Sequence, residues 1–317
     1  MRNNYIFYLL TAVGLAALPG CHQEPDLPAS IIPASCQLGL VELVEQDYQV
    51  RTNNQYDAFG QLKKVDYQFV MPSLNYTAQT VHTYSSDRYL TNSVETVTYV
   101  GRQPQSGDVV STRTTYQYDG TPKQISRVEY AYTTAGGRTY SDTDEYLYTN
   151  GRLTTYQTKN SGGEVIRKYT FGTDGKLQAY SDGSVWTNTV TNGKITKREK
   201  PGDGSVITCA FDSKGQRLQL EETYPATKRR IVTQYTYDDR LNPALAQLKR
   251  RGFPDLDLGG STQVNNQTAI RTQTYQNDAL ISDVTQTMRH TYNAAGYSLG
   301  SASSTGARIR NYYTNCP

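Results

Sequence analysis

A short unit of strand, turn and strand recurs along this sequence and restricts the folds open to it. Its clearest copy runs from Glu145 to Tyr156, around the pair Asn150-Gly151. This pair is preferred in two-residue type I′ turns, because both central residues need positive φ and Asn and Gly adopt it at the least cost. The copy is therefore predicted to be a β-hairpin.

The turn also predicts which residues of this hairpin face each other. Thr149 is expected opposite Arg152, and Tyr148 opposite Leu153, because strands joined by a two-residue loop pair directly outward from it. Side chains alternate between the two faces of a strand. One face is then expected to carry Tyr146, Tyr148, Leu153 and Thr155, and the other Leu147 and Tyr156.

A second form of the unit has Asp or Asn after the aromatic residue and Gly three positions later. This pattern favours a type I turn whose Gly takes the left-handed conformation and closes a hairpin with a bulge. Counting the residue that enters each turn gives about ten units, most of them about 19 to 34 residues apart, as expected of a repeat architecture. These anchor residues are Tyr56, Tyr84, Tyr118, Tyr148, Phe171, Val190, Phe211, Tyr237, Tyr275 and Tyr292.

The composition fits a sheet whose faces are only partly buried. The chain contains 27 tyrosines but 6 phenylalanines, and its hydrophobic fraction is 36%. Tyrosine and threonine suit a pleated strand, and each carries a hydroxyl group that accepts a watery surface. The sequence therefore predicts an all-β fold, a long antiparallel meander of about ten hairpins curled into an open roll or barrel-like sheet.

The regular spacing breaks between Tyr237 and Tyr275, and this gap contains one short predicted helix. Asn242 suits the N-cap, Pro243 suits the first helical position, and Gly252 follows as a stop signal. The helix is expected to plug an end of the rolled sheet, and an ordered loop is the alternative.

The same interruption is where we expect any specific contact with a partner. Repeats supply a stiff scaffold, whereas interruptions of the repeat supply variety. Arginine and aromatic side chains are also the types enriched at interface hot spots. The candidate binding residues are Arg250, Arg251, Phe253, Asp255 and Asp257. The alternative is that this segment only caps the open end of the sheet.

The amino terminus predicts export and lipid anchoring. A basic start and an apolar run over 5–18 are typical of a secretory signal, here residues 1–20. The run ends in Pro19-Gly20-Cys21 and resembles a lipobox, in which the matching cysteine is acylated, so Cys21 is expected to carry lipid. His22 in place of Asp favours the outer membrane, with the periplasmic or the surface face left open. Residues 21–35 are then a tether, and residues 36–317 the β domain.

Three cysteines remain once Cys21 is lipidated, and an odd number cannot all pair within the chain. Cys36 precedes the first repeat and Cys316 follows the last. A disulfide between these two would join the first and last strands. Cys209 is then expected to be a free thiol inside a strand, in the alternating run Val206 to Phe211.

Charge and motifs argue against several other functions. Removal of residues 1–20 leaves 31 basic and 29 acidic residues, interspersed along the chain. That pattern lacks the basic patch expected of a nucleic-acid-binding protein. The sequence has no GxSxG, Walker or HExxH motif, and its acidic clusters at 142–145 and 255–257 lack the spacing of a calcium loop. We therefore predict a non-catalytic monomer without cofactor or metal.

Three stretches carry a resemblance to a known family: 116–120, 146–153 and 235–238, which read YQYDG, YLYTNGRL and YTYD. They resemble the YD repeat of RHS-type proteins, and more closely that of the YD-repeat lipoproteins common in Bacteroidota. The resemblance covers about residues 48 to 313. Large RHS proteins form a β-sheet shell around a C-terminal toxin, but this chain has too few repeats for such a shell, so a toxin is not expected.

Three functions stay open on the sequence. The favoured one is a lipid-anchored cell-envelope protein with a non-catalytic structural or binding role, its partner being a glycan or another protein. A polysaccharide-acting enzyme would need two carboxylates about 5 to 10 Å apart in a cleft. A carrier of lipid or apolar ligand would need a curled sheet with an open apolar interior.

Overall fold

The computed structural model describes residues 37–45, 48–241, 252–254, 264–294 and 298–314. Within these ranges the chain forms only β-strands and one 3₁₀ turn, η1 (Pro225–Thr227). The strands are β1 (Gln37–Val44), β2 (Gln49–Tyr56), β3 (Leu62–Met71), β4 (Leu74–Tyr84), β5 (Leu90–Tyr99), β6 (Val109–Asp119), β7 (Gln124–Thr134), β8 (Thr139–Thr149), β9 (Arg152–Lys159), β10 (Val165–Phe171), β11 (Leu177–Ser181), β12 (Thr187–Thr191), β13 (Lys194–Lys200), β14 (Ser205–Phe211), β15 (Arg217–Tyr224), β16 (Arg229–Leu241), β17 (Asn265–Gln276), β18 (Ala279–Tyr292), β19 (Ser298–Ser303) and β20 (Arg308–Thr314).

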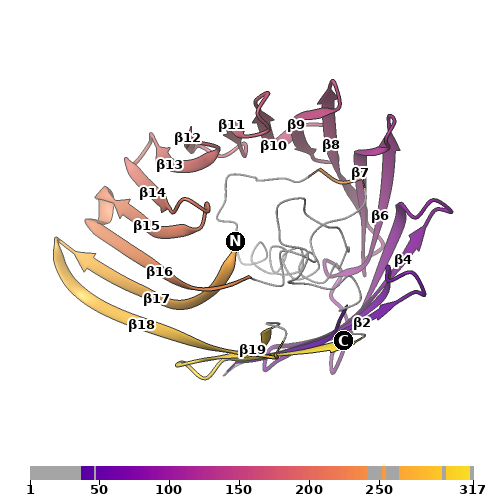
Figure 1. Cartoon of the computed structure of the whole chain (residues 1–317), viewed down its shortest axis with the longest axis horizontal. Helices are drawn as coiled ribbons and strands as arrows, with labels where there is room; N and C mark the ends of the chain where they lie inside the picture. The colour runs from indigo at the N-terminus through magenta and orange to yellow at the C-terminus, as the bar shows by residue number, and fades with distance from the viewer. Residues whose placement is uncertain (1–36, 46–47, 242–251, 255–263, 295–297, 315–317) are drawn as a thin grey trace.

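The strands form a meander that closes on itself. Each pairs antiparallel with the next from β1 to β11 and again from β12 to β20. The first and last strands also pair, with Gln37 opposite Thr314 and Val44 opposite Arg308. Successive strands therefore follow one another around a nearly closed, barrel-like ring (Figure 1). The predicted all-β class and curled meander are confirmed.

Side chains join the ring where the described backbone pairing is interrupted, between β11 and β12. Asn188 Nδ2 on β12 donates to the carbonyl of Tyr180 on β11 across 3.3 Å. The guanidinium of Arg198 on β13 bonds both Asn188 Oδ1 at 2.9 Å and Asp182 Oδ2 at 2.6 Å. This network replaces a backbone ladder at the junction.

The turns have the predicted chemistry. Asn150 and Gly151 have φ values of 51° and 73°, as a type I′ turn requires, and Thr149 lies opposite Arg152. In the second form, Gly60 has φ +78°, and Asp57 Oδ1 accepts hydrogen bonds from the backbone N–H groups of Phe59 and Gln61. The aspartate therefore fixes the turn through its own side chain.

A register shift accompanies every one of the ten predicted anchor residues. One strand gains an extra residue beside the anchor, which is the mark of a β-bulge. The shift falls immediately before Tyr56, Tyr84, Tyr118, Tyr148, Phe171, Val190, Phe211, Tyr237, Tyr275 and Tyr292. Because bulges increase strand twist, this repeated position helps to curl the meander.

One face assignment from the sequence is wrong because of such a bulge. Tyr148 does lie opposite Leu153, but the next pair is Leu147 with Thr155, which leaves Thr154 as the extra residue. Beyond it Tyr146 pairs with Tyr156, and the two rings stack with centroids 4.9 Å apart. Tyr156 therefore lies on the aromatic face, and Thr155 on the other.

Two of the anchor tyrosines, Tyr84 and Tyr237, have a further role that a phenylalanine could not fill. The hydroxyl of Tyr84 donates to the carbonyl of Leu62 at 2.9 Å, and that of Tyr237 to the carbonyl of Arg217 at 2.7 Å. Each acceptor is the first residue of the preceding strand, just after its turn. The tyrosine hydroxyl thus satisfies a backbone carbonyl beside the turn of the neighbouring hairpin.

The tyrosines build the inner face of the ring as cross-strand stacks. Rings at 146, 156, 169 and 180 on β8 to β11 lie 4.7 to 5.4 Å apart. Such pairs are the ordinary unit of sheet stabilisation. One buried cluster consists of Ile125, Val128, Tyr146, Tyr156, Tyr169, Phe171 and Leu177, and a second of Phe69, Tyr76, Ala78 and Val97. Among the described residues, the first cluster lies on β7 to β11 and the second on β3 to β5.

Candidate functional site

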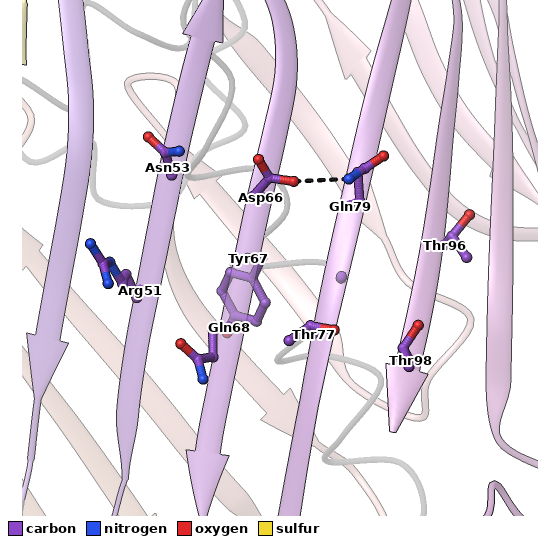
Figure 2. Close-up of a pocket in the computed structure, with 10 residues that line it drawn as sticks. Arg51, Asn53, Asp66, Tyr67, Gln68, Thr77, Gln79, Thr96 and Thr98 are labelled. Atoms are coloured by element: carbon purple, nitrogen blue, oxygen red, sulfur yellow. Dashed lines mark hydrogen bonds between the residues drawn. The ribbon is translucent and has the colours of Figure 1, made fainter. Parts of the chain in front are cut away.

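A groove of about 590 Å³ crosses β2 to β5 on the face opposite the second buried cluster. Figure 2 shows that its polar side chains come from four neighbouring strands. They are Arg51, Asn53, Asp66, Gln68, Thr77, Gln79, Thr96 and Thr98. Tyr67 and Ala78 also border the groove, although both belong to the inner face.

The strand register arranges these side chains in two parallel rows. The first row runs straight across the strands through Asn53, Asp66, Gln79 and Thr96. The second row runs in the same way through Arg51, Gln68, Thr77 and Thr98. Neighbouring strands lie about 4.8 Å apart and the rows are two residues apart, so each row is about 14 Å long and the rows are about 7 Å apart.

The two rows differ in how their polar groups are used. Asp66 is the centre of the first row, accepting from Gln79 Nε2 at 3.0 Å and Gln55 Nε2 at 3.2 Å, with Lys64 Nζ at 3.0 Å. In the second row, the side chains of Gln68 and Thr77 make no hydrogen bond to any other described residue, and both are exposed. The second row therefore presents donors and acceptors that remain available to a ligand.

Stacked rings on the inner side hold the floor of the groove in place. Phe69 and Tyr76 stack with centroids 5.3 Å apart, and Tyr76 lies 6.1 Å from Tyr99. Burial raises the pKa of Tyr67 to about 12, and burial also raises the pKa of Tyr76. These phenols stay protonated and uncharged at neutral pH. The groove is thus a polar surface on a packed, rigid wall.

Three acidic side chains near the inner face, Glu95, Asp142 and Asp144, have a raised pKa. Burial raises the pKa of Glu95, and burial together with the charge of Asp144 raises that of Asp142. Burial also raises the pKa of Asp144, although Thr158 donates to it at 2.7 Å and Tyr130 at 3.0 Å. These bonds tie Asp144 into the wall between β7 and β9.

The geometry of these acids meets only part of what a glycosidase needs. Asp142 and Asp144 are two residues apart on one strand face, about 7 Å, within the range for paired carboxylates. Neither lines the groove on the outer face, however, and Asp144 is only 6% exposed. The described residues also contain no group of three His, Cys, Asp or Glu side chains that could hold a metal ion.

Of the five residues predicted to bind a partner, the structure describes Phe253 alone. Its ring is half buried and packs against the inner face, with centroids 6.0 Å from Tyr116 and 6.3 Å from both Tyr118 and Tyr146. The carbonyl of Gly252 accepts from the backbone N–H of Ile125 at 2.6 Å. The short coloured segment 252–254 lies inside the ring beside β7 (Figure 1). These contacts favour the capping alternative for this segment.

The remaining residues of that prediction lie outside the described part of the chain. They are Arg250, Arg251, Asp255 and Asp257, and the predicted helix after Asn242 lies there too. Sequence reasoning missed the groove residues entirely. A signal was present: four successive predicted strands each carry polar residues two positions apart, at 51 and 53, 66 and 68, 77 and 79, and 96 and 98.

Cys209 lies in β14, as predicted, and is a free cysteine whose pKa is raised by burial. Cys21, Cys36 and Cys316 lie outside the described residues, so their lipid and disulfide remain predictions. The outermost pair between β1 and β20 is Gln37 with Thr314, close in sequence to the two terminal cysteines. None of the described helical segments has the length and hydrophobicity to span a membrane.

Comparison with known proteins gives structural neighbours but no family. No family model matches the chain, and no curated protein matches it. Among solved structures, the toxin complex TcdB2-TccC3 matches with a TM-score of 0.41 and 11% identity, over 85% of this chain and 15% of that one. A porin-like protein from Bacteroides uniformis matches with a TM-score of 0.36 and 13% identity, over 87% of this chain and 96% of that one. A second porin-like protein, from Bacteroides vulgatus, matches with a TM-score of 0.35 and 11% identity, over 87% of this chain and 98% of that one.

Proposed function

We propose that this protein is a lipid-anchored component of the cell envelope whose β-ring is a non-catalytic scaffold that binds a hydroxyl-rich polymer, a glycan, in the groove across β2 to β5. The observation that carries the proposal is the pair of polar rows on the groove. The rows offer guanidinium, amide, hydroxyl and carboxylate groups on one rigid surface, and such groups fix the orientation of a polar ligand.

Several features favour a sugar chain over other ligands. An extended polymer matches a straight row of about 14 Å better than a compact ligand does. Each of the four strands contributes one polar side chain to the row, so contacts recur along its whole length. The side chain of Arg51 is 60% exposed, and Asp66 lines the same groove, so the groove offers both a positive and a negative group. Hydroxyl groups both donate and accept, and so they complement such a mixed surface.

The envelope location rests on the amino terminus. The apolar run over 5–18 followed by Cys21 resembles an export signal with a lipidation site, and the aromatic repeats resemble those of Bacteroidota YD-repeat lipoproteins. Residues 21–35 contain Pro25, Pro28 and Pro33, which suits an extended tether that holds the ring away from the membrane. The proposed site is the outer membrane.

The groove is tested by removing the second row. In the full chain carrying Cys21→Ser for solubility, Gln68→Ala, Thr77→Ala and Thr98→Ala together are expected to weaken binding to envelope polysaccharide by about tenfold or more, since about 1.4 kcal/mol corresponds to that factor. The measurement is the amount of protein that immobilised envelope polysaccharide retains. A glycan array serves as the probe where the polymer has not been identified. Stability is expected to stay the same because these side chains are exposed or bond no described residue.

A matched variant controls for loss of surface polarity. Thr189→Ala, Thr208→Ala and Gln234→Ala remove the same three residue types from exposed positions on β12, β14 and β16. This control is expected to bind as the parent does. Equal binding by the groove variant and the parent would place the ligand elsewhere and sink the proposal.

The anchor is tested separately, by changing Cys21 to Ser in cells. The variant is expected to move from the membrane fraction to the soluble fraction, because it has lost the acyl chains that supply membrane affinity. The measurement is fractionation of cells, together with metabolic labelling by a palmitate analogue. Cys209→Ser, at the free cysteine in β14, is the control and is expected to stay on the membrane. Unchanged membrane association of the Cys21 variant would contradict the anchor.

A further inference from the structure

The second polar row of the groove continues beyond β2, onto the two strands that close the ring, β1 and β20 (the seam). Arg51 lies opposite Glu42 of β1, and Glu42 lies opposite Arg310 of β20. These three side chains share the outer face, because directly opposite residues of paired strands point the same way. Arg51 and Asn53 mark this side of the groove in Figure 2. The row therefore spans six strands, about 24 Å, from Arg310 to Thr98.

The first row continues in the same way and ends on an aromatic ring. Asn53 lies opposite Leu40, and Leu40 lies opposite Tyr312. Tyr312 is 45% exposed, and its hydroxyl donates to Glu42 Oε2 at 3.4 Å. A tyrosine ring presents a flat face with a negative quadrupole, which suits the C–H groups on the face of a sugar ring. The seam therefore adds a stacking surface to the polar rows.

The seam also carries an excess of positive charge. Within the described strands β19, β20, β1 and β2, the charged residues are three arginines and one acid: Arg51, Arg308, Arg310 and Glu42. Arg51 Nε lies 3.7 Å from Glu42 Oε1, which is longer than a hydrogen bond. Arg308 and Arg310 are exposed and make no ion pair within the described part of the chain. The guanidinium groups at the seam are therefore open to an anionic ligand.

We propose that the glycan of the groove is acidic, a chain of sugars whose carboxylates are bound by Arg51 and Arg310, with one sugar ring stacked on Tyr312. This inference rests on the proposed function and names the class of its ligand. Arginine suits a carboxylate because its planar guanidinium donates two parallel hydrogen bonds to the two oxygens. In the groove itself, Lys64 Nζ lies 3.0 Å from Asp66 and offsets its charge, so the seam supplies the preference for an acid.

The spacing of the two arginines fits an extended polymer. They lie on β20 and β2, two strand spacings apart, or about 10 Å. A sugar unit of an extended chain is about as long as one strand spacing, so carboxylates on every second unit meet Arg51 and Arg310. Glu42 lies between them and faces the intervening unit, whose hydroxyl groups donate to it. A single sugar reaches only one arginine, and so we expect a chain to bind more tightly than its monomer.

The test compares acidic polymers with their own neutral forms. Polygalacturonate and polymannuronate, and the same polymers with their carboxylates reduced to primary alcohols, are titrated into the full chain carrying Cys21→Ser, by calorimetry. At least one acidic polymer is expected to bind about tenfold or more tightly than its reduced form. Salt at about 1 M is expected to remove this difference by screening the charges.

The outcomes separate this inference from the glycan groove itself. Equal binding of the acidic and reduced polymers overturns the inference and leaves the groove as a glycan site. Binding of a neutral glycan on the array without binding of either polyuronate does the same. Failure to bind any glycan removes the proposed function together with the inference.

A double variant tests the two arginines. Arg51→Gln with Arg310→Gln is expected to weaken polyuronate binding by about tenfold or more and to leave binding of the reduced polymer unchanged, which also shows that the variant is folded. The control is Arg138→Gln with Arg229→Gln, which removes the same charge from exposed positions in the β7–β8 turn and on β16. It is expected to bind as the parent does. An equal loss in both double variants would mean that net charge alone attracts the polymer, and it overturns the inference.

Two single variants test the other residues of the seam. Glu42→Gln is expected to tighten polyuronate binding by about threefold, because it removes an exposed negative charge between the two arginines. Tyr312→Ser is expected to weaken the acidic and reduced polymers alike, by about fivefold, because stacking does not need the carboxylates. Polyuronate binding that neither variant changes would place the acidic chain away from the seam and overturn the inference.

Discussion

The chain carrying Gly300→Ala is expected to lose about 3 to 5 kcal/mol of unfolding free energy, because strain and overpacking add at this position. Gly300 is buried in β19, between Thr291 of β18 and Arg310 of β20. An added Cβ would lie 2.1 Å from the carbonyl oxygen of Ile309 and 3.1 Å from its carbonyl carbon. These are backbone atoms held in a ladder, so no flexible side chain is present to move aside.

The measurement is urea unfolding followed by far-ultraviolet circular dichroism. Gly202→Ala is the control, because its Cβ would meet no atom within 4 Å and its φ is not in the left-handed region. That change is expected to alter stability by less than about 0.5 kcal/mol. If the two variants unfold at the same urea concentration, β19 and β20 are less tightly paired than the structure indicates.

The second large effect is expected for Phe253→Ala, which removes the ring that packs on the inner face. The loss is expected to be about 3 kcal/mol, at the low end for a phenylalanine because the ring is half buried. It would leave a void beside Tyr116, Tyr118 and Tyr146. The measurement is again the change in unfolding free energy.

Phe59→Ala controls for the loss of an aromatic ring in itself. Phe59 is 67% exposed, and its ring lies 4.2 Å from the guanidinium carbon of Arg88. Its removal is expected to cost about 1 kcal/mol or less. Comparing the Phe253→Ala and Phe59→Ala variants also shows whether the segment between Tyr237 and Tyr275 binds a partner or caps the sheet. A Phe253→Ala protein that keeps its stability but loses a partner would show that the segment binds rather than caps.

The sequence predicted local structure well because turn chemistry is local. Asn150-Gly151 and the Asp57 to Gly60 turn have the conformations that their residue types favour. The extra residue in the Asn150-Gly151 hairpin, Thr154, was not foreseen, because it differs in no way from a threonine in regular alternation. A bulge depends on both strands of a pair, and single-strand periodicity does not contain that information. The wrong face for Tyr156 followed from this.

The groove could not be predicted because it depends on register over four strands. Arg51 and Thr98 are 47 positions apart in the sequence, yet they belong to one row. Alternating polar residues predict only that a face is exposed. Whether such residues align into rows depends on turn lengths and bulges in three successive hairpins.

The pairing of β1 with β20 has a consequence for the order of folding. Nearly all other strand contacts join neighbours in the sequence, and such hairpins form within microseconds. Closing the ring instead brings Gln37 to Thr314, and the chain entropy lost in closing a loop of that length is roughly 5 kcal/mol. The closing ladder must therefore form late and cooperatively. Until the last strand is made, β1 has one unpaired edge, and a chain that is still being completed is most exposed to misassembly at its beginning.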